Sequence, residues 1–337
     1  MAFYTIEKTK IRSFLNRLLT EFTLIAPLKK DNRTSFEEVV NSGEVVLTSR
    51  NTDKSPKGSF FPQTEVMFSY KEGKIHKPEM KGRRLLFGIR PCDAKGFVLL
   101  DKVFAGGDFE DVYYKEKREG ALIFGMACNE PQTTCFCTSF HTGPYDKENV
   151  DVFWVDIGEG FLLESITERG EAVLEKQGLS KASSEDIRKV DELKKAAESE
   201  ISDRLDVSGL KEGLSGLFDN PIWEEIYLRC VGCGICTFFC PTCHCFDIVD
   251  EGDRQSGKRI RIWDSCMFPL FTLHASGHQP RETGKERFRQ RIMHKFNYFP
   301  EKFGEAACVG CGRCVVNCPV NLDIREVVTV QPLIDTD

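Results

Sequence analysis

A cysteine motif occurs twice in the C-terminal part of the chain. CVGCGICTFFCP at residues 230–241 recurs almost unchanged as CVGCGRCVVNCP at residues 308–319, and both copies follow the pattern C-x2-C-x2-C-x3-C-P. Three closely spaced thiolates can bind three irons of one [4Fe-4S] cube, whereas the fourth cysteine lies too far along the chain and usually completes the other cube. The motifs are therefore predicted to interlock around two one-electron centres, the first held by Cys230, Cys233, Cys236 and Cys318 and the second by Cys308, Cys311, Cys314 and Cys240.

Zinc is the main alternative metal for this spacing, because C-x2-C pairs separated by a long insert also occur in zinc ribbons. Four cysteines in each of two motifs exceed what one tetrahedral ion needs, so iron-sulfur clusters are favoured. Disulfides are disfavoured, because the first residues, MAFYTIEKTK, lack the charged start and apolar run of a secretory signal. The cytoplasm is thus the predicted compartment, and fifteen cysteines there indicate metal binding.

Four further cysteines lie in the N-terminal part of the chain. Cys92 follows the apolar run LLFGI, and Cys128 directly follows ALIFGMA. If these runs form parallel neighbouring strands, both cysteines emerge at the same carboxyl edge of a sheet, where open α/β sheets bind ligands. Cys135 and Cys137 follow on the next loop, and residues two apart in an extended segment point the same way. The four thiolates are predicted to hold a third [4Fe-4S] cluster, with unliganded thiols as the alternative.

Three cysteines remain, Cys243, Cys245 and Cys266. The sequence TCHC at residues 242–245 echoes TCFC at residues 134–137, but three thiols do not complete a four-thiolate site. We expect them to line the environment of the clusters, with a further metal site as the alternative.

The insert between the two motifs carries an apolar stripe at four-residue spacing beside a basic stripe of the same spacing. The apolar members are Phe288, Ile292 and Phe296, and the basic members are Arg287, Arg291 and Lys295. A helix that packs on one face is predicted here. Its basic face has three interpretations: an ordinary solvated surface, cations that raise the reduction potential of a nearby cluster, or a docking surface for an acidic partner.

Several other functions lack support in the sequence. The net charge of -6 argues against general nucleic-acid binding, and the chain has no apolar run long enough to enter a membrane directly. No G-x-G-x-x-G follows a plausible strand, so neither flavin nor NAD is expected to bind this chain. GDRQSGKR at residues 252–259 resembles a phosphate loop, but Arg259 replaces the hydroxyl residue and the following RIRIW indicates a strand. No catalytic residue is predicted, since every clustered cysteine has a better use as a ligand.

The length of 337 residues is sufficient for about two domains. Apolar spacing predicts a helix over about residues 5–21 and a charged helix over residues 181–204. Strands are predicted at residues 45–47, 85–89, 121–126, 152–155 and 161–163. Breakers at Gly213, Gly216 and Asp219-Asn220-Pro221 indicate a linker. The predicted fold is a mixed α/β domain over residues 1–215, followed by a mostly helical domain over residues 216–337 with two [4Fe-4S] clusters of the ferredoxin type.

These motifs together resemble a known family. IRPCDAKG, CNEPQTTCFCTSFHTGP, CVGCGICTFFCPTCHCFD, WDSC, ASGH-x-x-R, HKFNY and CVGCGRC are similar to motifs of the beta subunit of soluble sulfhydrogenases and of its counterpart in anaerobic sulfite reductase. The resemblance covers nearly the whole chain. It implies a 4Fe-4S dicluster subunit in a hetero-oligomer that relays electrons between a flavin subunit handling NAD(P)H and a second redox subunit of hydrogenase, sulfite reductase or heterodisulfide-reductase type. It also favours the third cluster.

Two other classes of function stay open at this point. An independent iron-sulfur reductase would bind its substrate at an open iron near Cys243, Cys245 and Cys266. A zinc-binding interaction module would use the cysteines of the two repeated motifs without any redox chemistry.

Overall fold

The computed structural model describes residues 2–48, 50–79, 82–201 and 205–329. Within it the chain forms two compact units. The first comprises Met1–Phe60, Lys81–Arg204 and Val309–Cys311, and the second comprises Phe61–Met80, Leu205–Cys308 and Gly312–Asp337. Each unit thus takes a segment from the other end of the chain, which places three residues of the second cysteine motif in the first unit.

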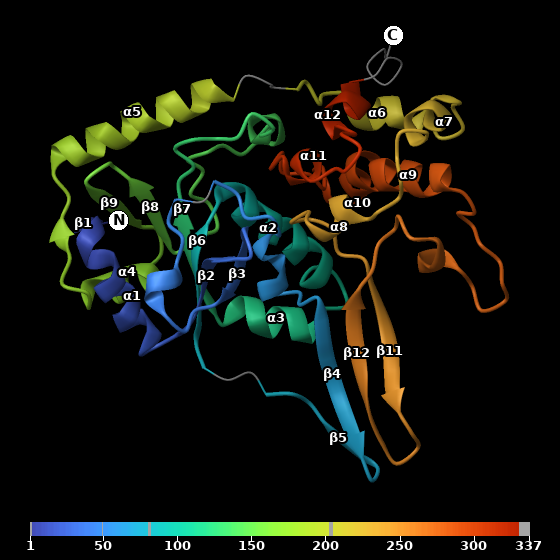
Figure 1. Ribbon diagram of the computed structural model, residues 1–337, viewed down its shortest axis with the longest axis horizontal. Helices are drawn as coiled ribbons and strands as arrows, with labels where there is room; N and C mark the ends of the chain where they lie inside the picture. The colour runs from blue at the N-terminus through green and yellow to red at the C-terminus, as the bar shows by residue number, and fades with distance from the viewer. Residues whose placement is uncertain (1, 49, 80–81, 202–204, 330–337) are drawn as a thin grey trace. The chain divides into compact units, whose positions relative to one another are not determined.

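The first unit is built on an eight-stranded sheet in the order β10-β1-β9-β8-β7-β6-β2-β3 (Figure 1). The neighbours β2, β6, β7 and β8 are parallel, and the remaining pairs are antiparallel. The strands are β1 (Phe3–Glu7), β2 (Thr23–Lys30), β3 (Arg33–Glu38), β6 (Arg84–Ile89), β7 (Ala121–Met126), β8 (Val152–Asp156), β9 (Gly160–Ser165) and β10 (Ser180–Lys181). The strands before Cys92 and Cys128, β6 and β7, are parallel neighbours, which meets the condition on which the third site was predicted.

Helices accompany this sheet, and aromatic side chains form its core. The helices are α1 (Ile11–Leu19), α2 (Pro91–Phe104), α3 (Val112–Glu119), α4 (Glu168–Glu175) and α5 (Ser184–Glu200). Trp154 of β8 is fully buried and packs edge-on against Phe14 of α1, with 5.2 Å between ring centroids. Side chains of α1 and α4 belong to this same core. Phe60 packs instead against Phe97 of α2 and Tyr114 of α3.

Some predicted boundaries differ from the structure. The helix expected over residues 5–21 is shorter, because Tyr4 and Ile6 are buried between less buried neighbours and pair with β9 as a strand. The expected strand at residues 45–47 is wrong: Val45 makes only an isolated bridge to Leu28 after a 3-10 turn at Ser42–Glu44. The charged helix predicted over residues 181–204 is α5, which begins after a capping box formed by Ser183 and Asp186. Residues 202–204 lie outside the described residues.

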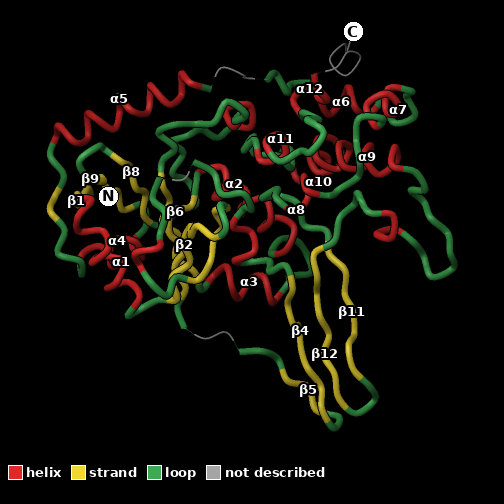
Figure 2. The backbone as a smooth tube through the Cα atoms, viewed as in Figure 1, coloured by secondary structure: helices red, strands yellow, loops and turns green. Residues whose placement is uncertain are grey.

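The second unit contains a four-stranded antiparallel sheet in the order β11-β12-β4-β5. Figure 2 shows β11, β12 and β4 as long strands that run side by side. The strands are β4 (Thr64–Lys71), β5 (Lys74–His76), β11 (Phe246–Gly252) and β12 (Ser256–Trp263). The strand predicted from RIRIW is confirmed as part of β12, which leaves GDRQSGKR in a hairpin rather than before a helix. The part of the chain predicted as mostly helical therefore also contains sheet.

The first cysteine motif and most of the second lie among the short helices of the second unit. These are α6 (Leu210–Ser215), α7 (Ile222–Tyr227), α8 (Ile235–Phe238), α9 (Gly284–Met293), α10 (Phe299–Phe303), α11 (Arg313–Val316) and α12 (Ile324–Thr329). A π-helical turn, His294–Tyr298, continues α9 and leads into α10. Within the described ranges, no helix combines the length and apolar composition that crossing a bilayer requires.

Candidate iron-sulfur centres

The two cysteine motifs share one backbone conformation. Gly232 and Gly234 in the first copy have φ of 67° and 74°, and Gly310 and Gly312 in the second have φ of 59° and 71°. These left-handed conformations favour glycine, because a Cβ would clash with the backbone. A short helix, α8 or α11, begins directly after the second glycine of each copy. The repeated sequence therefore produces a repeated local structure.

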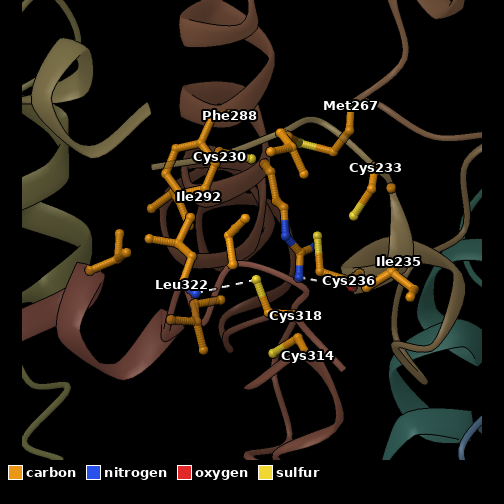
Figure 3. Close-up of a pocket in the computed structure, with 16 residues that line it drawn as sticks. Cys230, Cys233, Ile235, Cys236, Met267, Phe288, Ile292, Cys314, Cys318 and Leu322 are labelled. Atoms are coloured by element: carbon orange, nitrogen blue, oxygen red, sulfur yellow. Dashed lines mark hydrogen bonds between the residues drawn. The ribbon is translucent and has the colours of Figure 1, made fainter. Parts of the chain in front are cut away.

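The four cysteines predicted for the first cluster line a single cavity (Figure 3). Cys230, Cys233 and Cys236 reach it from the first motif, and Cys318 reaches it from the second. Apolar side chains complete the wall, among them Met267, Phe288, Ile292 and Val327. Cys314, predicted as a ligand of the second cluster, also lines this cavity.

Backbone amides already point at two of the cavity sulfurs. Gly232 N–H donates to Cys230 Sγ at 3.4 Å, and Leu322 N–H donates to Cys318 Sγ at 3.2 Å. Burial raises the pKa of Cys230, and the nearby Cys236, Cys233 and Cys318 raise it further. Several thiolates within an apolar cavity need a cation to balance their negative charge. Hydrogen bonds to sulfur are one means by which proteins set the reduction potential of iron-sulfur clusters. This donor set fits a [4Fe-4S] cluster.

Cys240 is the fourth cysteine of the first motif, and its surroundings favour the thiolate form. A hydrogen bond from Cys243 lowers the pKa of Cys240, and the charge of Lys295 lowers it further against the effect of burial. Lys295 Nζ lies 3.3 Å from Cys240 Sγ. Thr242 Oγ1 lies 3.1 Å from the same sulfur. These contacts therefore stabilise the thiolate of Cys240, which is the form in which a cysteine binds a metal.

The other cysteines predicted for the second cluster fall in both compact units. Cys308 and Cys314 belong to the second unit with Cys240, and Cys311 belongs to the first unit. In the first unit, Phe136 N–H donates to Gly310 O at 2.8 Å. A Cβ on Gly310 would approach Phe136 O to 2.3 Å, so the glycine is required for this close contact.

Cys243, Cys245 and Cys266 lie near one another in the second unit. Cys243 donates to Cys240, and Cys245 is hydrogen-bonded to Cys266, whose pKa is raised by this bond and by burial. Arg291 Nη1 lies 3.4 Å from Cys243 Sγ. Among the described residues, no three His, Cys, Asp or Glu side chains gather closely enough to hold a single metal ion, so we propose no mononuclear site for these three cysteines.

The helix predicted between the motifs is confirmed as α9 and its π-helical continuation. Phe288, Ile292 and Phe296 are buried, as the apolar stripe predicted. The interpretation of the basic stripe as a solvated surface is wrong for two of its members, because Arg291 is 4% exposed and Lys295 is 3% exposed. Arg287 is half-buried and donates to the carbonyls of Arg281 and Glu282.

Two of the four N-terminal cysteines, Cys92 and Cys135, lie beside Asn51 in the first unit. The Asn51 side-chain amide lies 4.0 Å from both Cys92 Sγ and Cys135 Sγ. Burial raises the pKa of Cys137 to about 12, and the neighbouring Cys135 and Cys128 contribute to the rise. Cys92 lies in the first turn of α2, and Cys128 follows β7. The meeting of all four side chains at one edge of the sheet stays a prediction.

Two polar atoms beside this group add to the fit with a bound cluster. The side-chain oxygens of Thr134 and Thr138 flank Cys135 and Cys137, and both are buried without a hydrogen-bond partner among the described residues. Buried polar atoms of this kind call for a further bound group. All four thiols are buried or half-buried, and burial raises the pKa of Cys128 and of Cys137, which likewise suits a cation that binds thiolates.

The sequence did not single out Asn51 or Thr242 as part of these sites. Asn51 Nδ2 also donates to Cys311 O at 2.9 Å, and Thr242 Oγ1 donates to Ala307 O at 2.7 Å. Thr242 directly precedes Cys243, which offered a weak signal, but Asn51 lies far from every cysteine in the sequence.

Comparisons with known proteins identify the family of this chain. A family model described as a 4Fe-4S dicluster domain matches residues 229–322. Sulfhydrogenase 2 subunit beta of Pyrococcus furiosus is 32% identical to this chain over 326 residues, which cover 96% of this chain and 96% of that protein. No solved structure gives a significant match. The chain therefore belongs to the family of sulfhydrogenase beta subunits and is an iron-sulfur electron-transfer subunit.

Proposed function

We propose that this chain relays single electrons between a flavin subunit that handles NAD(P)H and a second redox subunit, within a cytoplasmic hetero-oligomer. The observation that carries the proposal is the cavity in which Cys230, Cys233 and Cys236 meet Cys318 from the other motif. A [4Fe-4S] cluster supplies reversible one-electron chemistry when it is bound by four thiolates. The chain contributes those thiolates, the amide donors that face them and the apolar wall that limits water.

Our ligand assignment follows the interlocked pattern of the two motifs. The first cluster takes Cys230, Cys233, Cys236 and Cys318, and the second takes Cys308, Cys311, Cys314 and Cys240. We assign Cys243, Cys245 and Cys266 to the surroundings of the second cluster, where Cys243 donates a hydrogen bond to Cys240.

A third [4Fe-4S] cluster on Cys92, Cys128, Cys135 and Cys137 belongs to the same proposal. It is supported by the shared Asn51 contacts and by the two buried hydroxyls of Thr134 and Thr138. Cys135 Sγ lies 4.0 Å from Cys311 O. This proximity supports an electron path from the third site to the second cluster that enters at Cys311, one of the ligands assigned to that cluster.

The partners are inferred from the relative and from what the chain itself supplies. The relative is named as one subunit of a sulfhydrogenase, and such a name implies other chains. We expect flavin and NAD(P)H to bind one of those chains, and the terminal reaction, whether of hydrogenase, sulfite reductase or heterodisulfide-reductase type, to occur on another.

Anaerobic purification followed by iron, sulfide and zinc analysis tests the proposal. About eight irons per chain are expected for two clusters, or about twelve with the third, together with electron paramagnetic resonance (EPR) signals after dithionite reduction. Zinc without iron would replace the proposal with the interaction module. Substrate turnover by the isolated chain without a flavin subunit would identify an independent reductase instead.

A further inference from the structure

Lys295 occupies an unusual place for a lysine. It lies in the π-helical turn His294–Tyr298, and 3% of the residue is exposed. Its ammonium nitrogen donates to Ala307 O at 2.7 Å and to Thr242 Oγ1 at 2.9 Å, and it lies 3.3 Å from Cys240 Sγ. Single π-helical turns inside α-helices occur frequently at functional sites.

These contacts join the two cysteine motifs. Thr242 follows the end of the first motif, and Ala307 directly precedes Cys308, the first cysteine of the second. Both backbone polar groups of Ala307 bond to Lys295, since Ala307 N–H donates to the carbonyl of Lys295 at 2.8 Å. The lysine therefore connects the loop after Cys240 to the residue before Cys308, which are the two motif ends that our proposal brings to the second cluster.

The charge of Lys295 has no carboxylate partner among the described residues, where its contacts are two neutral oxygens and one sulfur. Removing an ammonium ion from water costs several kcal/mol unless an opposite charge lies close by. Arg291, one helical turn earlier, is a second buried cation. Its guanidinium contacts Cys236 O at 2.9 Å and Cys243 Sγ at 3.4 Å. Two buried cations thus face cysteines and no acid, so the balancing negative charge must come from thiolates.

We propose that Lys295 is the fixed counter-charge of the second cluster and sets its reduction potential above the value it would have with a neutral residue at this position. This inference rests on the proposed function. Reduction adds one electron, and so one negative charge, to a centre that already carries thiolate charge. A cation 3.3 Å from a ligand sulfur stabilises that added charge, and no proton need move.

A purely structural role would rest on the same hydrogen bonds, so the test must separate charge from shape. Lys295→Met removes the charge and the donors at similar length, and Lys295→Arg keeps the charge. Lys285→Met is the matched control, because Lys285 lies on the same helix but pairs with Glu224 at 3.1 Å. Each variant is prepared as the full chain with its clusters, and the potentials are measured by EPR-monitored titration. The signal of the second cluster is identified as the one that Cys308→Ser abolishes.

We expect Lys295→Met to keep its iron. Half-reduction of its second cluster should require a ratio of reduced to oxidised reductant at least tenfold higher than in wild type. This corresponds to a reduction potential that is lower by about 59 mV or more. Lys295→Arg should recover most of this shift, and Lys285→Met should show none. An unchanged potential in iron-loaded Lys295→Met would overturn the inference while leaving the proposed function intact.

If Lys295→Met loses its iron, Lys295→Arg decides the matter. Retained iron with a potential less than about 59 mV from that of wild type supports the counter-charge, because arginine keeps the charged donor of lysine but not its shape. Loss of iron in this variant as well would mean that the shape of lysine is required, which overturns the inference. A wild-type chain without iron or EPR signal would refute the proposed function itself, and the inference with it.

Discussion

The exchange of one cysteine between the motifs can be tested by counting iron. Cys318 belongs to the second motif by sequence, yet it lines the cavity of Cys230, Cys233 and Cys236, and Leu322 N–H donates to its sulfur there. Replacing Cys318 by serine should therefore remove the first cluster. We expect a loss of about four irons per chain and of one EPR component, the same component that Cys230→Ser removes.

Paired substitutions make the prediction quantitative. Two ligands of one cluster act as a unit, so Cys230→Ser with Cys318→Ser should lose about four irons, as each does alone. Cys308→Ser with Cys318→Ser should lose about eight, because the two ligands serve different clusters. Cys245→Ser, assigned to the surroundings, is the control and should lose none. If Cys318→Ser instead removes the component lost in Cys308→Ser, each motif holds its own cluster and the interlocked assignment is refuted.

Three further predictions concern other parts of the chain. Cys135→Ser should lower the iron content by about four while both motif signals persist, and an unchanged iron content would argue against the third cluster. Gly310→Ala should lower stability more than Gly304→Ala. Both substitutions place a side chain in a left-handed conformation, which costs about 1–2 kcal/mol, but only the Cβ at Gly310 would meet a carbonyl oxygen, that of Phe136, at 2.3 Å. Equal thermal midpoints for the two variants would contradict the role given to this close contact. Arg261→Met should destabilise the chain by about 3–5 kcal/mol, because it removes the guanidinium that pairs with the buried carboxylate of Glu65, whereas adding Glu65→Gln, which removes the buried negative charge, should restore part of the loss in chemical denaturation.

The spacing of the cysteines in the sequence was the basis on which the two cluster sites were predicted. Ligand spacing along one stretch of chain is a local property, and so are the left-handed turns that Gly232 and Gly310 adopt. The apolar runs before Cys92 and Cys128 likewise predicted two strands, but their parallel adjacency was only a condition there, and the structure shows it in β6 and β7. The family resemblance, confirmed by the comparison, came from these same motifs.

Other features depended on contacts between distant parts of the chain. β4 (Thr64–Lys71) pairs with β12 (Ser256–Trp263), which lies far away in the sequence. β1, which directly precedes the helical region of α1, is a strand because it pairs with β9. The basic stripe had three interpretations, and its helical period is the same for each of them. Burial of Lys295 against Cys240 and Ala307 selected among them, since the free energy of a cation depends on the charges and solvent around it, which come from residues far away in the sequence.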